Sequence, residues 1–138
     1  MKFRDQVVWI TGASSGIGEG LTHAFAREGA RLVLHSLTLK ELENVAAKCT
    51  ENKVEFMLLA FDLSKTNDYP ALVKQVTDRF GRIDVLINNA GISQRALTHE
   101  TLAAVDRKIF EINFFSAIEL TKSVLPVMMV QGSGAIAA

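Results

Sequence analysis

The sequence predicts an α/β fold, with a doubly wound parallel sheet and helices on both of its faces. Short apolar runs alternate with helical patterns along the chain, and this alternation is typical of β-α-β units around a parallel sheet. The apolar runs are nearly continuous, as expected for strands that helices cover on both sides. The length of 138 residues, with 49% hydrophobic and 22% charged residues, suits one globular domain or part of one.

Each element is predicted by its own pattern. The first strand runs directly into a glycine turn, which leads into the first helix. The second helix is expected to begin near Thr38, because Thr38 and Glu41 have capping-box spacing. Gly29 and Gly81 follow helical runs and are expected to be C-terminal caps, since glycine adopts the left-handed conformation without a Cβ clash. The predicted strands are residues 7–11, 32–35, 54–60 and 83–88, with a fifth from about Gly134, and the predicted helices are residues 16–28, 39–50, 71–80 and about 101–130.

The composition argues against several classes of function. Fifteen Lys and Arg residues balance fifteen Asp and Glu residues, and no long basic run is available for a nucleic acid partner. The most apolar later stretch, residues 112–130, contains Glu119, Lys122 and Pro126, which argues against a membrane span. The charged start MKFRDQ leads directly into the first strand and leaves no room for a signal peptide. The expected location is therefore cytoplasmic.

The single cysteine, Cys49, excludes an internal disulfide and favours a reducing compartment. We expect it to pack as a small hydrophobic side chain. The histidines His23, His35 and His99 show no metal-ligand spacing with one another or with Cys49, so no metal site is expected.

The turn after the first strand contains Gly12, Gly16 and Gly18 in the pattern G-x-x-x-G-x-G. At a strand-to-helix junction, the unpaired N–H groups and the positive dipole end of the helix can hold an anionic phosphate. Glycines allow close approach of the backbone, and the hydroxyls of Ser14 and Ser15 can add hydrogen bonds. The pattern lacks the Gly-Lys-Ser/Thr of a Walker-type ATPase, while a tight turn without a ligand remains the alternative.

The chain contains the motif TGASSGIG at residues 11–18 and the motif NNAG at residues 88–91. Together these motifs resemble those of the short-chain dehydrogenase/reductase family. Two further features agree, namely Asp62 with Leu63 after the third strand and Asn113 in the long helix. The resemblance covers essentially the whole chain and implies a Rossmann-like, dinucleotide-binding fold. It also implies an NAD(P)-dependent oxidoreductase that transfers hydride between the nicotinamide and a small alcohol or carbonyl substrate.

The resemblance also assigns roles along the cofactor. The glycine turn would hold the phosphates, and Asp62, with the backbone of Leu63, would hydrogen-bond the adenine. Asn89, Ala90 and Gly91 would lie along the cofactor, at the carboxyl end of the fourth strand, where ligands bind in open parallel sheets. The alternative for Asp62 is a turn or N-cap aspartate before Ser64. Asn88 is interpreted as structural.

Asn113 places a polar amide within the apolar helical stretch EINFF. A buried amide is costly unless it is hydrogen-bonded, so a specific partner is expected. In the family this partner is a water on the proton relay from the catalytic lysine, which makes Asn113 the catalytic candidate of this chain. The alternative is a hydrogen bond to the backbone of its own helix.

The choice between NAD and NADP is expected at the end of the second strand, where an acid binds the ribose 2′-OH or an arginine binds a 2′-phosphate. The chain has His35-Ser36-Leu37 there and so lacks both. A missing carboxylate removes repulsion, and Ser36, Ser15 and Lys40 could help to hold a 2′-phosphate, so NADP is preferred over NAD. The expected cofactor-binding residues are Gly12, Ser14, Ser15, Gly16, Ile17, Gly18, Ser36, Asp62, Leu63, Asn89, Ala90 and Gly91.

The family's catalytic groups are a serine and a Tyr-x-x-x-Lys pair, in which the lysine adjusts the tyrosine pKa toward the working pH. The only tyrosine is Tyr69, and Val73 stands four residues later. The ending GSGAIAA resembles the opening of the fifth strand, whose far end would carry the serine. We therefore expect an N-terminal part of an oxidoreductase, with the catalytic C-terminal portion absent and the 138 residues inactive alone. The alternatives are a non-catalytic nicotinamide-nucleotide-binding module and, more remotely, a fragment that binds nothing.

The long helix carries too many apolar residues for one narrow stripe. We expect one side to face the sheet and another to face a partner helix, which in the family comes from a second subunit, so the complete protein is expected to be a homo-oligomer. The unpaired edge at the fifth strand also indicates an incomplete sheet. The loop Ser93-Gln94-Arg95 should border the substrate space, with Arg95 either solvated or facing an acidic substrate group.

Overall fold

A computed structural model describes residues 1–49 and 53–138. The described residues contain one five-stranded sheet in the order β3-β2-β1-β4-β5, in which every pair of neighbours is parallel. The order reverses at β1, which pairs with β2 on one side and with β4 on the other. Ligands in such sheets bind at this reversal, outside the carboxyl ends of the strands. The strands are β1 (Val7–Ile10), β2 (Arg31–Ser36), β3 (Phe56–Ala60), β4 (Val85–Ile87) and β5 (Ala135–Ala137).

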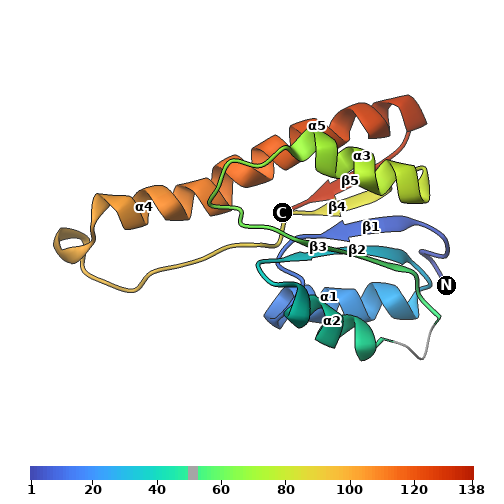
Figure 1. The fold of residues 1–138 in the computed structure, drawn as a ribbon, viewed down its shortest axis with the longest axis horizontal. Helices are drawn as coiled ribbons and strands as arrows, with labels where there is room; N and C mark the ends of the chain where they lie inside the picture. The colour runs from blue at the N-terminus through green and yellow to red at the C-terminus, as the bar shows by residue number, and fades with distance from the viewer. Residues whose placement is uncertain (50–52) are drawn as a thin grey trace.

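Helices cover both faces of the sheet (Figure 1). The helices α1 (Gly16–Arg27) and α2 (Leu39–Ala47) lie on one face. On the other face, α3 (Tyr69–Phe80) lies beside α5 (Ser116–Gln131), while α4 (Ala103–Phe110) continues the line of α5 beyond the sheet. The π-helical segment η3 (Glu111–Phe115) joins α4 to α5, and the 3₁₀ turn η2 (Thr98–Glu100) precedes α4.

The buried strand β1 divides the core in two. Val7 and Trp9 belong to the cluster under α3 and α5, whereas Val8 and Ile10 belong to the cluster under α1 and α2. All four side chains are fully buried, because successive residues of a strand point to opposite faces and both faces are covered. The nearly continuous apolar pattern therefore has the expected cause.

Helix α2 begins at the predicted residue, Leu39, but without the predicted side-chain cap, and α3 begins earlier than predicted. Thr38 is the N-cap of α2 but makes no side-chain cap hydrogen bond, so the predicted capping box is wrong. Instead, the Ser36 hydroxyl donates to the Thr38 carbonyl oxygen and accepts from its N–H. Helix α3 begins two residues before the predicted start, because Asp68 accepts from the Ala71 N–H at 3.0 Å and Pro70 suits the first turn. The predicted end of the second helix at Thr50 lies outside the described residues.

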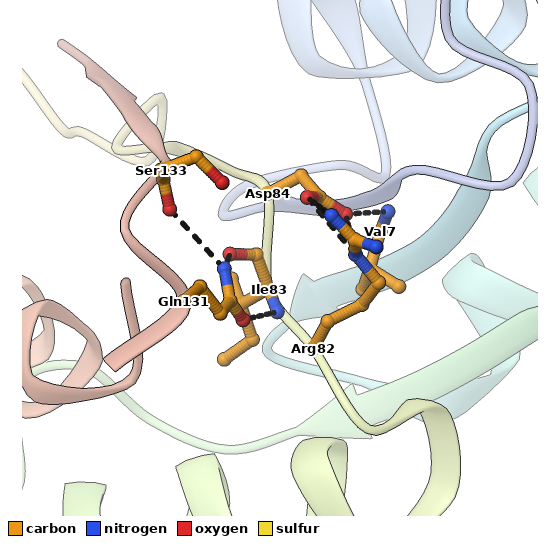
Figure 2. Close-up of polar contacts among 6 residues, drawn as sticks. All are labelled: Val7, Arg82, Ile83, Asp84, Gln131 and Ser133. Atoms are coloured by element: carbon orange, nitrogen blue, oxygen red, sulfur yellow. Dashed lines mark hydrogen bonds and ion pairs between the residues drawn. The ribbon is translucent and has the colours of Figure 1, made fainter. Parts of the chain in front are cut away.

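Two side chains hold the amino ends of the central strands together (Figure 2). The buried carboxylate of Asp84 accepts from the Val7 N–H at 2.8 Å and is paired with the Arg82 guanidinium. The amide of Gln131, at the end of α5, bonds both the N–H and the carbonyl oxygen of Ile83 at 2.9 Å. This end of the sheet is therefore closed by the protein's own polar groups.

The elements α4, η3 and α5 form one continuous helical rod, and the rest of the chain covers its apolar surface only in part. Phe110, Phe114 and Phe115 are 62%, 51% and 49% exposed, and the three residues of β5 are exposed at the edge of the sheet. Burial of this surface against a partner stays a prediction. Among the described residues, no helix combines the length and the apolarity that crossing a membrane would need.

Candidate cofactor-binding site

The glycine turn packs directly against the segment that follows β4. Gly12 and Gly16 have positive φ angles of 65° and 55°, a conformation that favours glycine. A Cβ atom on Gly12 would lie 2.8 Å from the Cα atom of Ala90, whereas one on Gly16 would meet nothing within 4 Å. Gly12 is therefore required for close packing, and the space beside Gly16 is open.

Gly18 serves the packing of helix α1 on the turn. A Cβ atom there would overlap the carbonyl oxygen of Gly12 and lie 2.7 Å from Nδ2 of Asn89. Gly18 is buried, and neither it nor Gly16 lines the cleft described below. Its lack of a side chain is thus explained by protein packing, and direct contact of Gly16 and Gly18 with a cofactor stays a prediction.

A buried threonine ties the turn to the end of β4. The Thr11 hydroxyl accepts from the backbone N–H groups of Asn89 and Ala90, both at 3.0 Å, and donates to the Ile87 carbonyl oxygen. The Asn89 side chain donates to the carbonyl oxygens of Thr11 and Gly12, both at 3.1 Å. The predicted residue Asn89 therefore builds the wall of the site with its side chain. Asn88 donates to the Thr121 hydroxyl and so links β4 to α5, which agrees with its structural interpretation.

His35 holds the glycine turn from the other side. Its Nδ1 atom accepts from the Gly12 N–H at 3.3 Å, and its Nε2 atom lies 2.9 Å from the Phe61 carbonyl oxygen. A neutral ring with the proton on Nε2 satisfies both contacts. The residue is only 3% exposed, and this burial lowers the pKa of the imidazole. His35 thus fixes the turn as a neutral side chain.

A cleft of about 560 Å³ lies at the carboxyl ends of the strands, in the size range of small-molecule and cofactor sites. Ser14 and Ser15 lie on its rim, and within the described residues their hydroxyls have no hydrogen-bond partner. Ser15 is also the N-cap of α1, so the first N–H groups of that helix lie beside the cleft. The predicted residues that line the cleft are Gly12, Ser14, Ser15, Ile17, Ser36, Asp62, Leu63, Asn89, Ala90 and Gly91.

Asp62 lines the cleft and also forms the turn that was its alternative interpretation. Its Oδ1 atom accepts from the N–H and the hydroxyl of Ser64, at 2.8 Å and 2.7 Å. These hydrogen bonds are the main reason why the carboxyl pKa is lowered. The group is therefore an acceptor at neutral pH. Its hydrogen bond to an adenine stays a prediction.

Asn113 is not the buried amide that the sequence predicts. It is exposed in η3 and does not line the cleft. Its amide bonds the N–H and the carbonyl oxygen of Ile92, both at 2.8 Å, rather than the backbone of its own helix. Asn113 therefore fastens the loop after β4 to the helical rod, and its predicted part in a proton relay stays untested.

Comparison with known proteins identifies the family. The family model described as short chain dehydrogenase matches residues 6–138. The chain belongs to the short-chain dehydrogenase family. Dehydrogenase/reductase SDR family member 7 from Homo sapiens is 44% identical over 136 residues, which cover 96% of this chain and 40% of that protein. Dehydrogenase/reductase SDR family protein 7-like from Drosophila melanogaster is 42% identical over 143 residues, which cover 98% of this chain and 44% of that protein. The chain thus spans less than half the length of these relatives.

Solved structures of a short-chain oxidoreductase and of a sugar reductase share the fold. A metagenomic short-chain oxidoreductase in complex with NADP has a TM-score of 0.92 and 29% identity, over 99% of this chain and 62% of that chain. L-Sorbose reductase from Gluconobacter frateurii, complexed with NADPH and L-sorbose, has a TM-score of 0.91 and 32% identity, over 99% and 52% of the two chains. The Rossmann-like fold that the sequence predicts is thereby confirmed.

Two residues of this short-chain dehydrogenase site were missed by the sequence reasoning. His35 was considered for metal-ligand spacing and as an uncharged position at the end of the second strand, but its hydrogen bonds were not, although a buried histidine needs polar partners. Glu41, in the first turn of α2, lines the cleft beside Ser36 and Leu37. Its position one turn into the next helix is the signal that could have indicated it.

Three other side chains with reactive or ionisable groups, those of Cys49, Tyr69 and Arg95, do not line the cleft. The sulfur of Cys49 is 3.2 Å from Nδ1 of His23, in a buried position that agrees with a packed thiol. The sole tyrosine, Tyr69, is 3% exposed in the core under α3. Arg95 is exposed, and within residues 1–49 and 53–138 it makes no ion pair.

Proposed function

We propose that this chain is the cofactor-binding part of an NAD(P)-dependent oxidoreductase, which transfers hydride between a nicotinamide cofactor and an alcohol or carbonyl substrate. The observation that carries the proposal is the cleft at the reversal in strand order. There the hydroxyls of Ser14 and Ser15, which have no partner in the part of the chain that the structure describes, lie beside the start of α1. Anionic phosphates bind at such helix starts. The NADP and NADPH present in related solved structures support the same ligand class.

The residues of the cleft fit a dinucleotide. Ser14, Ser15 and the first N–H groups of α1 would hold the phosphates, because all of them can donate hydrogen bonds. The carboxylate of Asp62 would accept from an amino group of the adenine. The segment from Asn89 to Gly91 would lie along the cofactor toward its nicotinamide end. When bound, the nicotinamide donates or accepts the hydride.

The described residues offer no acid–base pair for the reaction. Tyr69 is buried away from the cleft, and a valine, Val73, rather than a lysine stands four residues after it. We therefore propose that the 138 residues bind the cofactor without turning it over. A non-catalytic nicotinamide-binding module is the second candidate, and the burial of Tyr69 favours it for this chain alone.

Between the two cofactors we propose a modest preference for NADP(H). The related structures that contain NADP, NADPH or 5-hydroxy-NADP support this preference, and no acid stands at the end of β2.

For the complete protein we propose a homo-oligomer that covers the exposed Phe110, Phe114 and Phe115. Light scattering that shows a stable monomer at micromolar concentration would contradict the oligomer.

Titration of the protein with NADPH, followed by cofactor fluorescence, tests the binding proposal. The double substitution Ser14→Ala and Ser15→Ala removes two donors, so we expect the Kd to rise about 30-fold, at about 1 kcal/mol for each hydrogen bond. Ser133→Ala is the matched control, because Ser133 lies at the opposite end of the sheet, beside the start of β5. A folded protein, as judged by circular dichroism, that shows no saturable signal would refute the proposal.

A further inference from the structure

The corner between β2 and α2 forms one wall of the cleft. Ser36 ends the strand, Leu37 follows it, and the first turn of α2 brings Glu41 to the same wall. Glu41 is exposed, and its carboxylate has no hydrogen bond or ion pair within the described residues. The carboxylate is therefore free to interact with a ligand.

The charges that face the cleft do not balance this carboxylate. Besides Glu41, the lining includes one acid, Asp62, one cation, Lys108, and the buried His35. Lys108 belongs to α4 and is close enough to Asp62 to contribute to its lowered pKa. Among the described lining residues, no cation comes from the β2–α2 corner itself. Lys40, next to Glu41 in α2, is exposed and does not line the cleft, so Glu41 is the charged lining residue of this corner among the described residues.

The hydroxyl of Ser36 is already engaged in its own turn. It donates to the Thr38 carbonyl oxygen at 2.8 Å and accepts from the Thr38 N–H at 3.3 Å. Ser36 is also only 4% exposed. Of the two polar side chains that line the cleft at this corner, Glu41 is therefore the one without a hydrogen-bond partner in the described part of the chain.

We propose that Glu41 is a specificity-determining residue, which distinguishes a hydroxyl from a phosphate at the 2′ position of the adenosine ribose. This inference rests on the proposed cofactor binding. In dinucleotide-binding folds, an acid about 20 residues after the glycine turn accepts from a ribose 2′-OH, and here that acid comes from the helix instead of the strand end. An ionised carboxylate accepts a hydrogen bond from the 2′-OH of NAD(H) and repels the 2′-phosphate of NADP(H). Glu41 therefore limits the preference for NADP(H) proposed above.

The test measures the Kd values of NADH and NADPH for the protein and for Glu41→Gln, by cofactor fluorescence at low salt. We expect the substitution to tighten NADPH about 3- to 10-fold, as for removal of a like charge in a partly exposed site, and to leave NADH unchanged or weakened up to about 3-fold. Glu43→Gln is the matched control, since Glu43 is exposed on the same helix but does not line the cleft. The effect on NADPH should shrink at about 1 M salt, where exposed charges are screened.

The outcomes separate this inference from the proposal on which it rests. A ratio of the two Kd values that moves less than 2-fold in Glu41→Gln, or that moves equally in Glu43→Gln, overturns the role of Glu41 while cofactor binding stands. A tighter Kd for NADH than for NADPH in the unmodified protein overturns only the NADP(H) preference. Absence of binding of both cofactors by the folded protein overturns the proposed function and the role of Glu41 together.

Discussion

Replacing Thr11 by valine tests whether the hydroxyl of this residue holds the site together. Valine has nearly the same shape but no hydroxyl, so the N–H groups of Asn89 and Ala90 lose the acceptor that lies 3.0 Å from each. A buried donor without a partner costs about 1–3 kcal/mol. Because both donors are only partly buried, we expect a loss of about 2–4 kcal/mol in the free energy of unfolding.

The assay is chemical denaturation followed by circular dichroism, with a thermal scan in parallel. A loss of about 2–4 kcal/mol corresponds to a Tm about 6–16 °C lower for a domain of this size. Thr22→Val is the matched control, because the Thr22 hydroxyl is buried too but donates only to the Gly18 carbonyl oxygen. That replacement leaves no donor without an acceptor, so it should cost less than about 1.5 kcal/mol. Equal losses in the two variants would refute the argument.

Two further predictions concern the glycine turn and its histidine. Gly18→Ala should destabilise the fold by more than about 2 kcal/mol, because its Cβ atom would overlap the Gly12 carbonyl oxygen. Gly20→Ala, in open space on the same helix, should stabilise it by about 0.5–1 kcal/mol, so a denaturation series in which both variants behave alike would contradict the packing role. Burial opposes protonation of His35, and protonation would remove the acceptor of the Gly12 N–H. The contribution of neutral His35 to the free energy of unfolding is therefore complete above the ordinary histidine pKa of 6.5, and it is lost as the pH falls through the lower pKa of the folded state. Unfolding free energies measured from pH 8 to pH 5 should show this loss in the unmodified protein and less of it in His35→Gln; identical slopes would rule out His35 as the cause.

The fold could be predicted because its main signals are local. The run VVWI is buried on both faces, as its continuous apolar pattern indicates. Gly81 adopts the left-handed C-cap conformation at a φ of 75°, which confirms its predicted role. Errors arose at helix ends, where one side chain decides the boundary. The start of α3 was missed because the capping by Asp68 was not weighed, although Asp68 and Pro70 together form a recognisable start signal.

The site could be predicted only where its residues are close in sequence. The glycine turn and the NNAG segment are contiguous motifs, and most of their residues line one cleft. The environment of Asn113 could not be predicted from neighbouring residues, because its partner Ile92 is 21 residues away in the sequence. In addition, the helical rod of α4, η3 and α5 that contains Asn113 extends beyond the sheet. Glu41 was missed for a related reason. Its contribution depends on how the first turn of α2 returns over the strand ends, and this is a property of tertiary packing.

The two ends of the sheet use their polar side chains differently, and this difference identifies the functional end. At the amino end, the carboxylate of Asp84 is hydrogen-bonded to the backbone of β1, and the amide of Gln131 to the backbone just before β4. At the carboxyl end, the Thr11 hydroxyl is used in the same way. The hydroxyls of Ser14 and Ser15 and the carboxylate of Glu41, which line the cleft there, have no partner within the described residues. Parallel strands bring all their carboxyl ends, and the starts of the helices that follow them, to one edge. Polar groups without a protein partner at that edge have hydrogen-bonding capacity that solvent or a ligand can use. The proposed cofactor binding therefore depends on Ser14 and Ser15, and the proposed cofactor specificity on Glu41, rather than on the better-bonded residues beneath them.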